Sequence, residues 1–242
     1  MTESSGAAVT WRFRFAGDKV SRVWNWQSDG PPDLARVVPI RKPRSSERQR
    51  HIPVTAYSLT MRDHLELESG LEHDLLRRLD RLHDVVALVP QPCQLKRGGS
   101  SSAKNTPDLL SLDDTGSVTL WNARLPHKMD DKFKLQVAMV EAACANVGWR
   151  HEVFNGLDRV ERLNLLWLHG YRRRPSWCDQ VAGEIGKEAS NDAATLGSLF
   201  RLDTGNGEAI AVVWHMVWSG ELDTNLSKRL TMETPVRAGL VA

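Results

Sequence analysis

Cysteine is scarce in this sequence of 242 residues, and its placement excludes two kinds of stabilising site. The three cysteines, Cys93, Cys144 and Cys178, are odd in number and form no Cys-x-x-Cys pair. This pattern predicts neither a disulfide framework nor a zinc knuckle. A reducing compartment fits such cysteine usage best.

Long hydrophobic runs are missing too. No stretch approaches the ~18 apolar residues that a membrane-spanning helix requires, and residues 1–8 lack the charged and apolar regions of a signal peptide. We therefore expect a cytoplasmic protein without a membrane partner. Hydrophobic residues make up 41% of the chain and charged residues 26%, as is typical of a folded protein with a core. The net charge of +2 neither requires nor excludes nucleic acid.

Several motifs of familiar enzyme classes are absent. The eight histidines form no His-Glu-x-x-His motif, Gly98-Gly99-Ser100 lacks the Lys-Ser/Thr ending of a phosphate loop, and no Gly-x-Ser-x-Gly occurs. The sequence thus gives no sign of a zinc protease, a P-loop protein or a serine hydrolase. Nine tryptophans are scattered without a fixed period, which predicts core packing rather than a repeat.

The hydrophobic pattern predicts an α/β fold. Alternating side chains over residues 10–26, with Gly17 and Asp18 in the middle, predict a β-hairpin, and leucines at helical spacing predict a helix over 69–82 with Ser69 as its N-cap. Next in order we expect an extended segment 85–95 bent at its prolines, a loop 96–105, a hairpin of strands 108–112 and 117–122, a helix 131–146, a strand 149–154 and a helix 157–171. This order describes a mixed sheet flanked by helices.

Composition also suggests three parts of the chain. Residues 1–50 hold the first hairpin and a basic arm, and residues 51–175 form the α/β domain. Pro175 follows a basic run and marks a boundary. Beyond it, expected helices over 189–201 and 209–219 and a polar tail make residues 176–242 a small helical or winged-helix unit.

Basic residues gather between positions 36 and 50, where six arginines and lysines face only Glu47. A solvated linker and an arm that contacts phosphates fit this pattern equally well. In the second case the candidate nucleic-acid contacts are Arg41, Arg44, Arg48 and Arg50, together with Lys104 of the later loop.

A candidate site lies around the second hairpin. Glu72 belongs to the first long helix, Asp108 opens the hairpin, and Asn122 and Arg124 are two residues apart near its end. The spacing of two places Asn122 and Arg124 on one face of a strand, which a hairpin can bring beside Asp108. Oxygen ligands of this kind hold divalent cations in nucleases. A surface hairpin with a turn-forming aspartate gives the same pattern, and Glu68 is expected only to be solvated or to repel Glu72 near the helix start.

Six segments in a fixed order carry a family resemblance over roughly residues 50 to 175. They are Ser69-Gly70-Leu71-Glu72, a strand ending in Gln91-Pro92, Thr106-Pro107-Asp108-Leu109, residues 118–126, and the closing segments 147–149 and 164–172. In this order they resemble the Ser-x-Leu-Glu helix, the Gln-Pro strand, the Pro-Asp, the Val-Lys-Pro strand and the end of the nuclease domain in TnsA-like proteins. These are endonuclease subunits of heteromeric transposases.

The resemblance implies a restriction-endonuclease-like fold and Mg²⁺-dependent DNA endonuclease activity, with Mn²⁺ as a substitute. It carries the metal-ligand role over to Glu72, Asp108 and Asn122, and the place of the catalytic lysine to Arg124. Asn122 stands where the family has Gln, Glu or Asp, so a charge is missing and the site is expected to be weaker. Arg124 keeps a positive charge but cannot act as a base, because guanidinium stays protonated.

The C-terminal region resembles the family's winged-helix-like domain through residues 214–222 and the leucines that follow. The partners implied are double-stranded DNA at transposon ends, a DDE-type transposase that cuts the other strand, and an AAA-type ATPase regulator. Two alternatives stay open. In the first, the protein is a catalytically impaired DNA-binding or assembly subunit, which Asn122 favours. In the second, it is a defence nuclease of the same fold.

Overall fold

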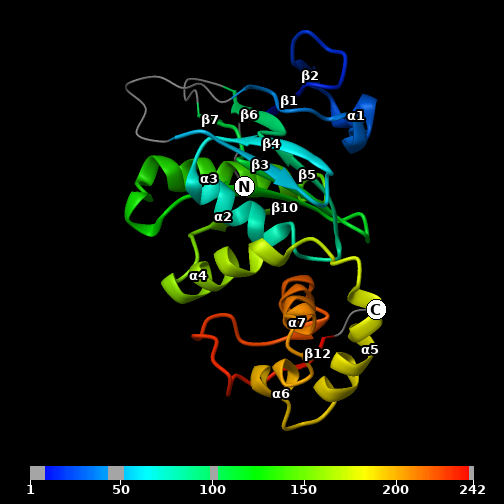
Figure 1. Cartoon of the computed structure of the whole chain (residues 1–242). Helices are drawn as coiled ribbons and strands as arrows, with labels where there is room; N and C mark the ends of the chain where they lie inside the picture. Colours follow the sequence, from blue (N-terminus) through cyan, green and yellow to red (C-terminus); the bar gives the residue numbers. More distant parts are fainter. Residues whose placement is uncertain (1–8, 43–51, 99–102, 240–242) are drawn as a thin grey trace. The chain divides into compact units, whose positions relative to one another are not determined.

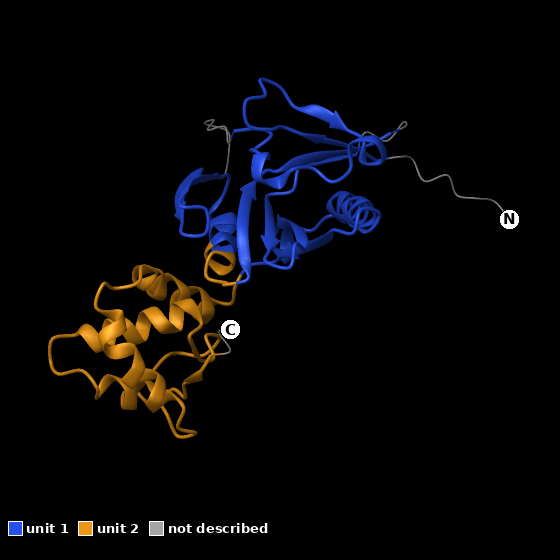
Figure 2. Cartoon of the chain, turned by 90° about the vertical axis from the view of Figure 1, so that its right-hand side faces the viewer, with its two compact units in different colours: residues 1–76, 84–156 blue, residues 77–83, 157–242 orange. Residues whose placement is uncertain are grey.

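The structure is a computed structural model that describes residues 9–42, 52–98 and 103–239 (Figure 1). It divides into two compact units, coloured separately in Figure 2: residues 1–76 with 84–156, and residues 77–83 with 157–242. Pro175, the expected boundary, lies inside the second unit. Within the described ranges, no helix has both the length and the apolar character needed to cross a membrane.

The first unit contains a mixed sheet of four strands in the order β10-β9-β8-β5. Its strands are β5 (Val85–Pro90), β8 (Leu109–Asp113), β9 (Val118–Ala123) and β10 (Arg150–Phe154). Strands β5, β8 and β9 are antiparallel neighbours, whereas β10 runs parallel to β9. The predicted second hairpin and the mixed α/β architecture are therefore confirmed.

A second sheet of four strands, in the order β2-β1-β6-β7, packs in the same unit. It comprises β1 (Val9–Phe13), β2 (Arg22–Trp24), β6 (Cys93–Arg97) and β7 (Lys104–Asn105). The pairing of β1 with β2 confirms the predicted first hairpin. The expected extended segment over 85–95 is bent between Pro90 and Cys93, but the bend joins strands of two different sheets, because Gln91 has a positive φ of 39° and turns the chain from one sheet into the other.

The remaining elements of the first unit are mostly short. They are α1 (Trp26–Asp29), η1 (Leu34–Arg36), the antiparallel pair β3 (Val54–Ser58) and β4 (Asp63–Leu67), α2 (Gly70–Leu79), η2 (Pro126–Lys128) and α3 (Asp131–Ala145). The last turn of α2 belongs to the second unit. Helices α2 and α3 confirm the two expected helices, and Asp130 caps α3 by accepting from the Phe133 amide at 2.7 Å.

Aromatic side chains form much of the core of the first unit. Trp11 and Phe13 of β1 are buried together with residues of β6, β8, β9 and α3. The rings of Trp11, Trp26 and Trp149 meet edge to face, with centroids 5.2 to 5.6 Å apart. These contacts confirm that the tryptophans here serve packing, and the core they build includes residues of both four-stranded sheets.

The second unit is mainly helical and has its own core. Its elements are α4 (Arg159–Leu168), η3 (His169–Tyr171), α5 (Cys178–Ala189), α6 (Leu196–Phe200), α7 (Glu208–Ser219) and the two-residue strands β11 (Leu222–Asp223) and β12 (Arg237–Ala238). The expected helix over 189–201 is wrong. Thr195 and Ser198 form a capping box that starts the short helix α6 only after α5 has ended.

Candidate metal centre

Asp108 is fixed by hydrogen bonds to both neighbouring strands. It lies directly before β8, where its amide donates to the Trp121 carbonyl at 2.7 Å and its carbonyl accepts from the Gln91 amide at 3.0 Å. One carboxylate oxygen accepts from the Ala123 amide at 2.7 Å. The backbone of Asp108 and one of its carboxylate oxygens are therefore held in place, which also fixes the direction of the second carboxylate oxygen.

Glu72 lies in the first turn of α2 and is fixed as firmly. Its carboxylate accepts from the Glu68 amide at 2.8 Å and from the Ser69 hydroxyl at 2.8 Å. The Ser69 hydroxyl in turn accepts from the Glu72 amide at 3.2 Å, which makes Ser69 the predicted cap of the helix. Gln91 adds a donated hydrogen bond from its side-chain amide at 3.3 Å.

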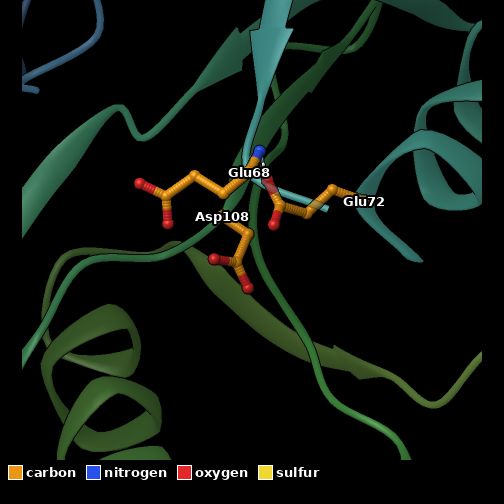
Figure 3. A group of neighbouring side chains, drawn as sticks. All are labelled: Glu68, Glu72 and Asp108. Atoms are coloured by element: carbon orange, nitrogen blue, oxygen red, sulfur yellow. Dashed lines mark hydrogen bonds between the residues drawn. The ribbon is translucent and has the colours of Figure 1, made fainter. Parts of the chain in front are cut away.

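Three carboxylates converge at this point. Glu68, Glu72 and Asp108 each place one oxygen within 4.8 Å of the other two, and Figure 3 shows the three side chains side by side. The predicted convergence of Glu72 and Asp108 is confirmed. The expectation for Glu68 was incomplete, because its side chain joins the cluster from the segment between β4 and α2.

Burial changes the acidity of this cluster. It raises the pKa of Glu72 from 4.5 to about 8, and the charge of Asp108 adds to the effect. Burial also raises the pKa of Asp108 from 3.8 to about 6, although hydrogen bonds from Ala123 and Asn122 work against the rise. Arg41 donates to Glu68 at 2.7 Å and is a nearby cation. Holding these carboxylates together in a buried place therefore lowers the stability of the first unit, which is typical of functional sites.

The cluster borders a pocket of about 460 Å³ in the first unit. Its lining residues are Glu68, Ser69, Gly70, Leu71, Glu72, Asn105, Asp108, Asn122, Ala123, Arg124, Leu125, Lys128, Phe133 and Gln136. Arg124 donates from Nε to the Lys128 carbonyl at 2.9 Å, and its guanidinium lies 5.2 Å from the centre of the Phe133 ring. Its terminal nitrogens have no hydrogen-bond partner within the described residues, so they can bind an anion. Lys128 was not predicted from the sequence.

Asn122 reaches the pocket but is engaged on both sides of its amide. Its side-chain oxygen lies 3.0 Å from Nε2 of His151, and its side chain also hydrogen-bonds the Asp108 carboxylate. Burial lowers the pKa of His151 to about 4, so the imidazole is neutral near pH 7. Because the Asn122 oxygen accepts and the Asp108 carboxylate also accepts, Nε2 of His151 and the Asn122 amide must be the donors.

The residues present fit a divalent cation held by oxygen ligands. Gln91 is wholly buried and Asn105 is 7% exposed, yet one side-chain oxygen of each has no hydrogen-bond partner in the described part of the chain. Buried polar atoms are normally satisfied. Three carboxylates and two unpartnered oxygens make a region rich in acceptors and poor in donors, which suits Mg²⁺ or Mn²⁺.

The candidate nucleic-acid contacts have different outcomes. Arg41 lies at the edge of the acidic cluster, where it pairs with Glu68. Lys104 is an exposed residue of β7, and its carbonyl accepts from the Gln136 side chain at 2.9 Å. Arg44, Arg48 and Arg50 lie outside the described residues.

Comparison with the models of known protein families gives no match, and comparison with curated proteins gives none either. The TnsA-like resemblance therefore depends on the ordered sequence motifs alone.

Proposed function

We propose that the protein is a TnsA-like, metal-dependent DNA endonuclease that cuts one strand at the end of a transposon. In this proposal the first unit has a restriction-endonuclease-like fold and the second a winged-helix-like fold. The observation that carries it is the convergence of Glu72, from a helix, with Asp108, from the start of a hairpin, in one pocket. This is the arrangement that the family motifs require.

The reaction is hydrolysis of a phosphodiester. Water attacks phosphorus, the bond to the 3′ oxygen breaks, and that oxygen takes up a proton to leave as a hydroxyl opposite a 5′ phosphate. Glu72 and Asp108 would hold a divalent cation, which would supply Lewis-acid stabilisation and a more acidic water when bound. Arg124 donates to a phosphate oxygen through its free terminal nitrogens, and the exposed Lys128 adds positive charge beside it.

Partners follow from the same proposal. A DDE-type transposase cuts the second strand, and an AAA-type ATPase controls the assembly on double-stranded DNA. The small second unit, with its separate core, is the natural part for protein contacts. Such a reaction takes place where the transposon DNA lies, which in this proposal implies a cytoplasmic protein.

A second candidate function is a nuclease-fold assembly subunit without catalysis. The observation in its favour is that Asn122 faces His151 and adds no charge to the pocket. In that case the acidic cluster is a remnant, and the protein contributes contacts alone.

End-labelled transposon DNA, assembled with a DDE-type transposase and an AAA-type ATPase, tests the proposal. We expect nicks with 5′ phosphates that require Mg²⁺ or Mn²⁺ and are absent with Asp108→Ala. Asp114→Ala, at an exposed turn of the same hairpin, is the matched control and should cleave normally. Unchanged nicking with Asp108→Ala contradicts the nuclease proposal. A loss of cleavage at the other strand in this variant, with the assembly intact, would not change that conclusion.

A further inference from the structure

Asn122, which the family pattern gives as the third ligand, makes other contacts in this structure. The Asn122 oxygen, which would have to face a cation, accepts from the buried His151 at 3.0 Å. A hydrogen bond from the Asn122 side chain lowers the pKa of Asp108, which links Asn122 to that carboxylate. His151 comes from β10, the parallel neighbour of β9, so two strands fix this orientation. Asn122 therefore positions Asp108 and offers the pocket no anionic oxygen.

Glu68 is the third acidic side chain beside Glu72 and Asp108. Its carboxylate lies within 4.8 Å of those of Glu72 and Asp108 (Figure 3). Its backbone amide donates to Glu72 at 2.8 Å, which fixes the start of its side chain against the cluster. A cation between Glu72 and Asp108 is thus within reach of Glu68 after a small side-chain adjustment.

Two independent observations indicate that this cluster takes a cation. The side-chain oxygens of Gln91 and Asn105 are buried and have no donor within the described residues. Gln91 is directed at the cluster, because its amide nitrogen donates to Glu72. Asn105 lines the same pocket. Buried acceptors without a donor, on a residue that hydrogen-bonds Glu72 and on a residue that lines the pocket, favour a positive ion over an anion or an apolar ligand.

Arg41 supplies a positive charge that is paired with the cluster through Glu68. The side chain of Arg41 is 50% exposed and that of Glu68 is 30% exposed. An ion pair so open to water contributes little to stability, so a bound cation can displace it readily. Arg41 is then free for a DNA phosphate.

We propose that Glu68 is the third carboxylate ligand of the metal centre, that Asn122 and His151 position Asp108, and that Arg41 competes with the cation for Glu68. The inference rests on the proposed function, since it names the ligand set of that same centre. In this ligand set the charged Glu68 replaces the neutral Asn122, which restores the charge that Asn122 lacks.

The test is Mn²⁺ binding to the full chain, measured by titration calorimetry and by the loss of the free Mn²⁺ electron paramagnetic resonance signal. We expect Glu68→Gln to weaken binding about tenfold or more, on the scale of losing a metal-site interaction. Arg41→Ala should strengthen binding several-fold. Glu66→Gln, an exposed neighbour on β4, is the matched control and should leave affinity unchanged.

The signs of these changes separate a ligand from a structural or a long-range role. If the Arg41–Glu68 pair served only the fold, both variants would weaken binding and lower stability to urea. A long-range charge effect would vanish in 1 M KCl, where the screening length is about 3 Å, whereas the loss of a ligand persists. The inference is overturned if both variants weaken binding and lower stability, or if the effect of Glu68→Gln vanishes in 1 M KCl.

Asp108→Ala separates the inference from the proposed function. Wild-type binding that is lost in Asp108→Ala but unchanged in Glu68→Gln overturns the inference alone. Absence of Mn²⁺ binding by the wild-type chain, or binding unaffected by Asp108→Ala, overturns both. We expect binding by the wild type, loss in Asp108→Ala and weakening in Glu68→Gln.

Discussion

The buried carboxyls make a prediction about stability and pH that does not require DNA or partners. A carboxyl whose pKa is higher in the folded than in the unfolded state retains a proton that the unfolded chain has lost. Its contribution to stability therefore falls as pH rises between the two pKa values. For Glu72 this window runs from about 4.5 to about 8. The metal-free protein should thus become less stable as pH rises toward 8.

The size of the effect follows from the shift. Between pH 6.5 and 8, Glu72 alone should lower the free energy of unfolding by about 1.5 kcal/mol. His151 acts in the opposite direction, because burial lowers its pKa to about 4 and stability is gained until pH passes its unfolded value of 6.5. Most of that gain lies below the window, so it offsets only a few tenths of a kcal/mol, roughly.

Urea unfolding followed by tryptophan fluorescence, at pH 6.5 and 8 in EDTA, measures this loss. Glu72→Gln cannot ionise and should flatten the pH dependence, while the exposed control Glu66→Gln should retain it. Saturating Mg²⁺ should abolish the loss, because the cation binds the deprotonated carboxylates. Wild-type stability that is constant or rises from pH 6.5 to 8 in EDTA, or a Glu72→Gln variant with the wild-type slope, would refute the reasoning.

Three further predictions concern other residues. Arg81 donates to the Trp218 carbonyl at 3.0 Å and the Val217 carbonyl at 3.1 Å, so Arg81→Ala should destabilise the second unit to urea by about 2 kcal/mol. Arg124→Ala should reduce DNA nicking about a hundredfold without changing Mn²⁺ affinity by calorimetry, as for a group that contacts the reacting phosphate. Lys104→Ala should reduce the slope of log affinity for DNA against log salt by about one in fluorescence anisotropy, if this exposed cation meets a phosphate.

The parts of the fold with strong local signals could be predicted. Helix α3 has an aspartate cap, Asp130, and a regular apolar face, and the β8–β9 hairpin has a turn in which Asp113 accepts from Thr115 and Ser117. The β3–β4 hairpin was missed because its turn contains no glycine. Arg62 takes the positive φ of 53° there, a conformation that the sequence does not announce.

Helix α5 was missed for a similar reason. Trp177 precedes it and gives no side-chain cap, so the usual start signal is absent. Its apolar residues are buried in the core of the second unit, and packing rather than local propensity stabilises the helix.

Only those residues of the candidate site that belong to the family motifs could be predicted from the sequence. Glu72 and Asp108 were placed together from the helix and the hairpin, and their convergence is a property of the fold. Glu68 carried no signal of its own, because its partner Arg41 is 27 residues away and their contact forms only in the folded chain. The contact of Asn122 with His151 depends on parallel pairing of β9 with β10, which spacing along the chain does not reveal.

Anomalous scattering from crystals soaked in MnCl₂ tests the central claim most directly, since it locates the cation itself. The account predicts a manganese peak beside the carboxylates of Glu72 and Asp108, and no peak there in Asp108→Ala crystals. A wild-type map without a peak at these carboxylates, or a peak that persists in Asp108→Ala, would contradict the claim that this pocket is the metal centre of a nuclease.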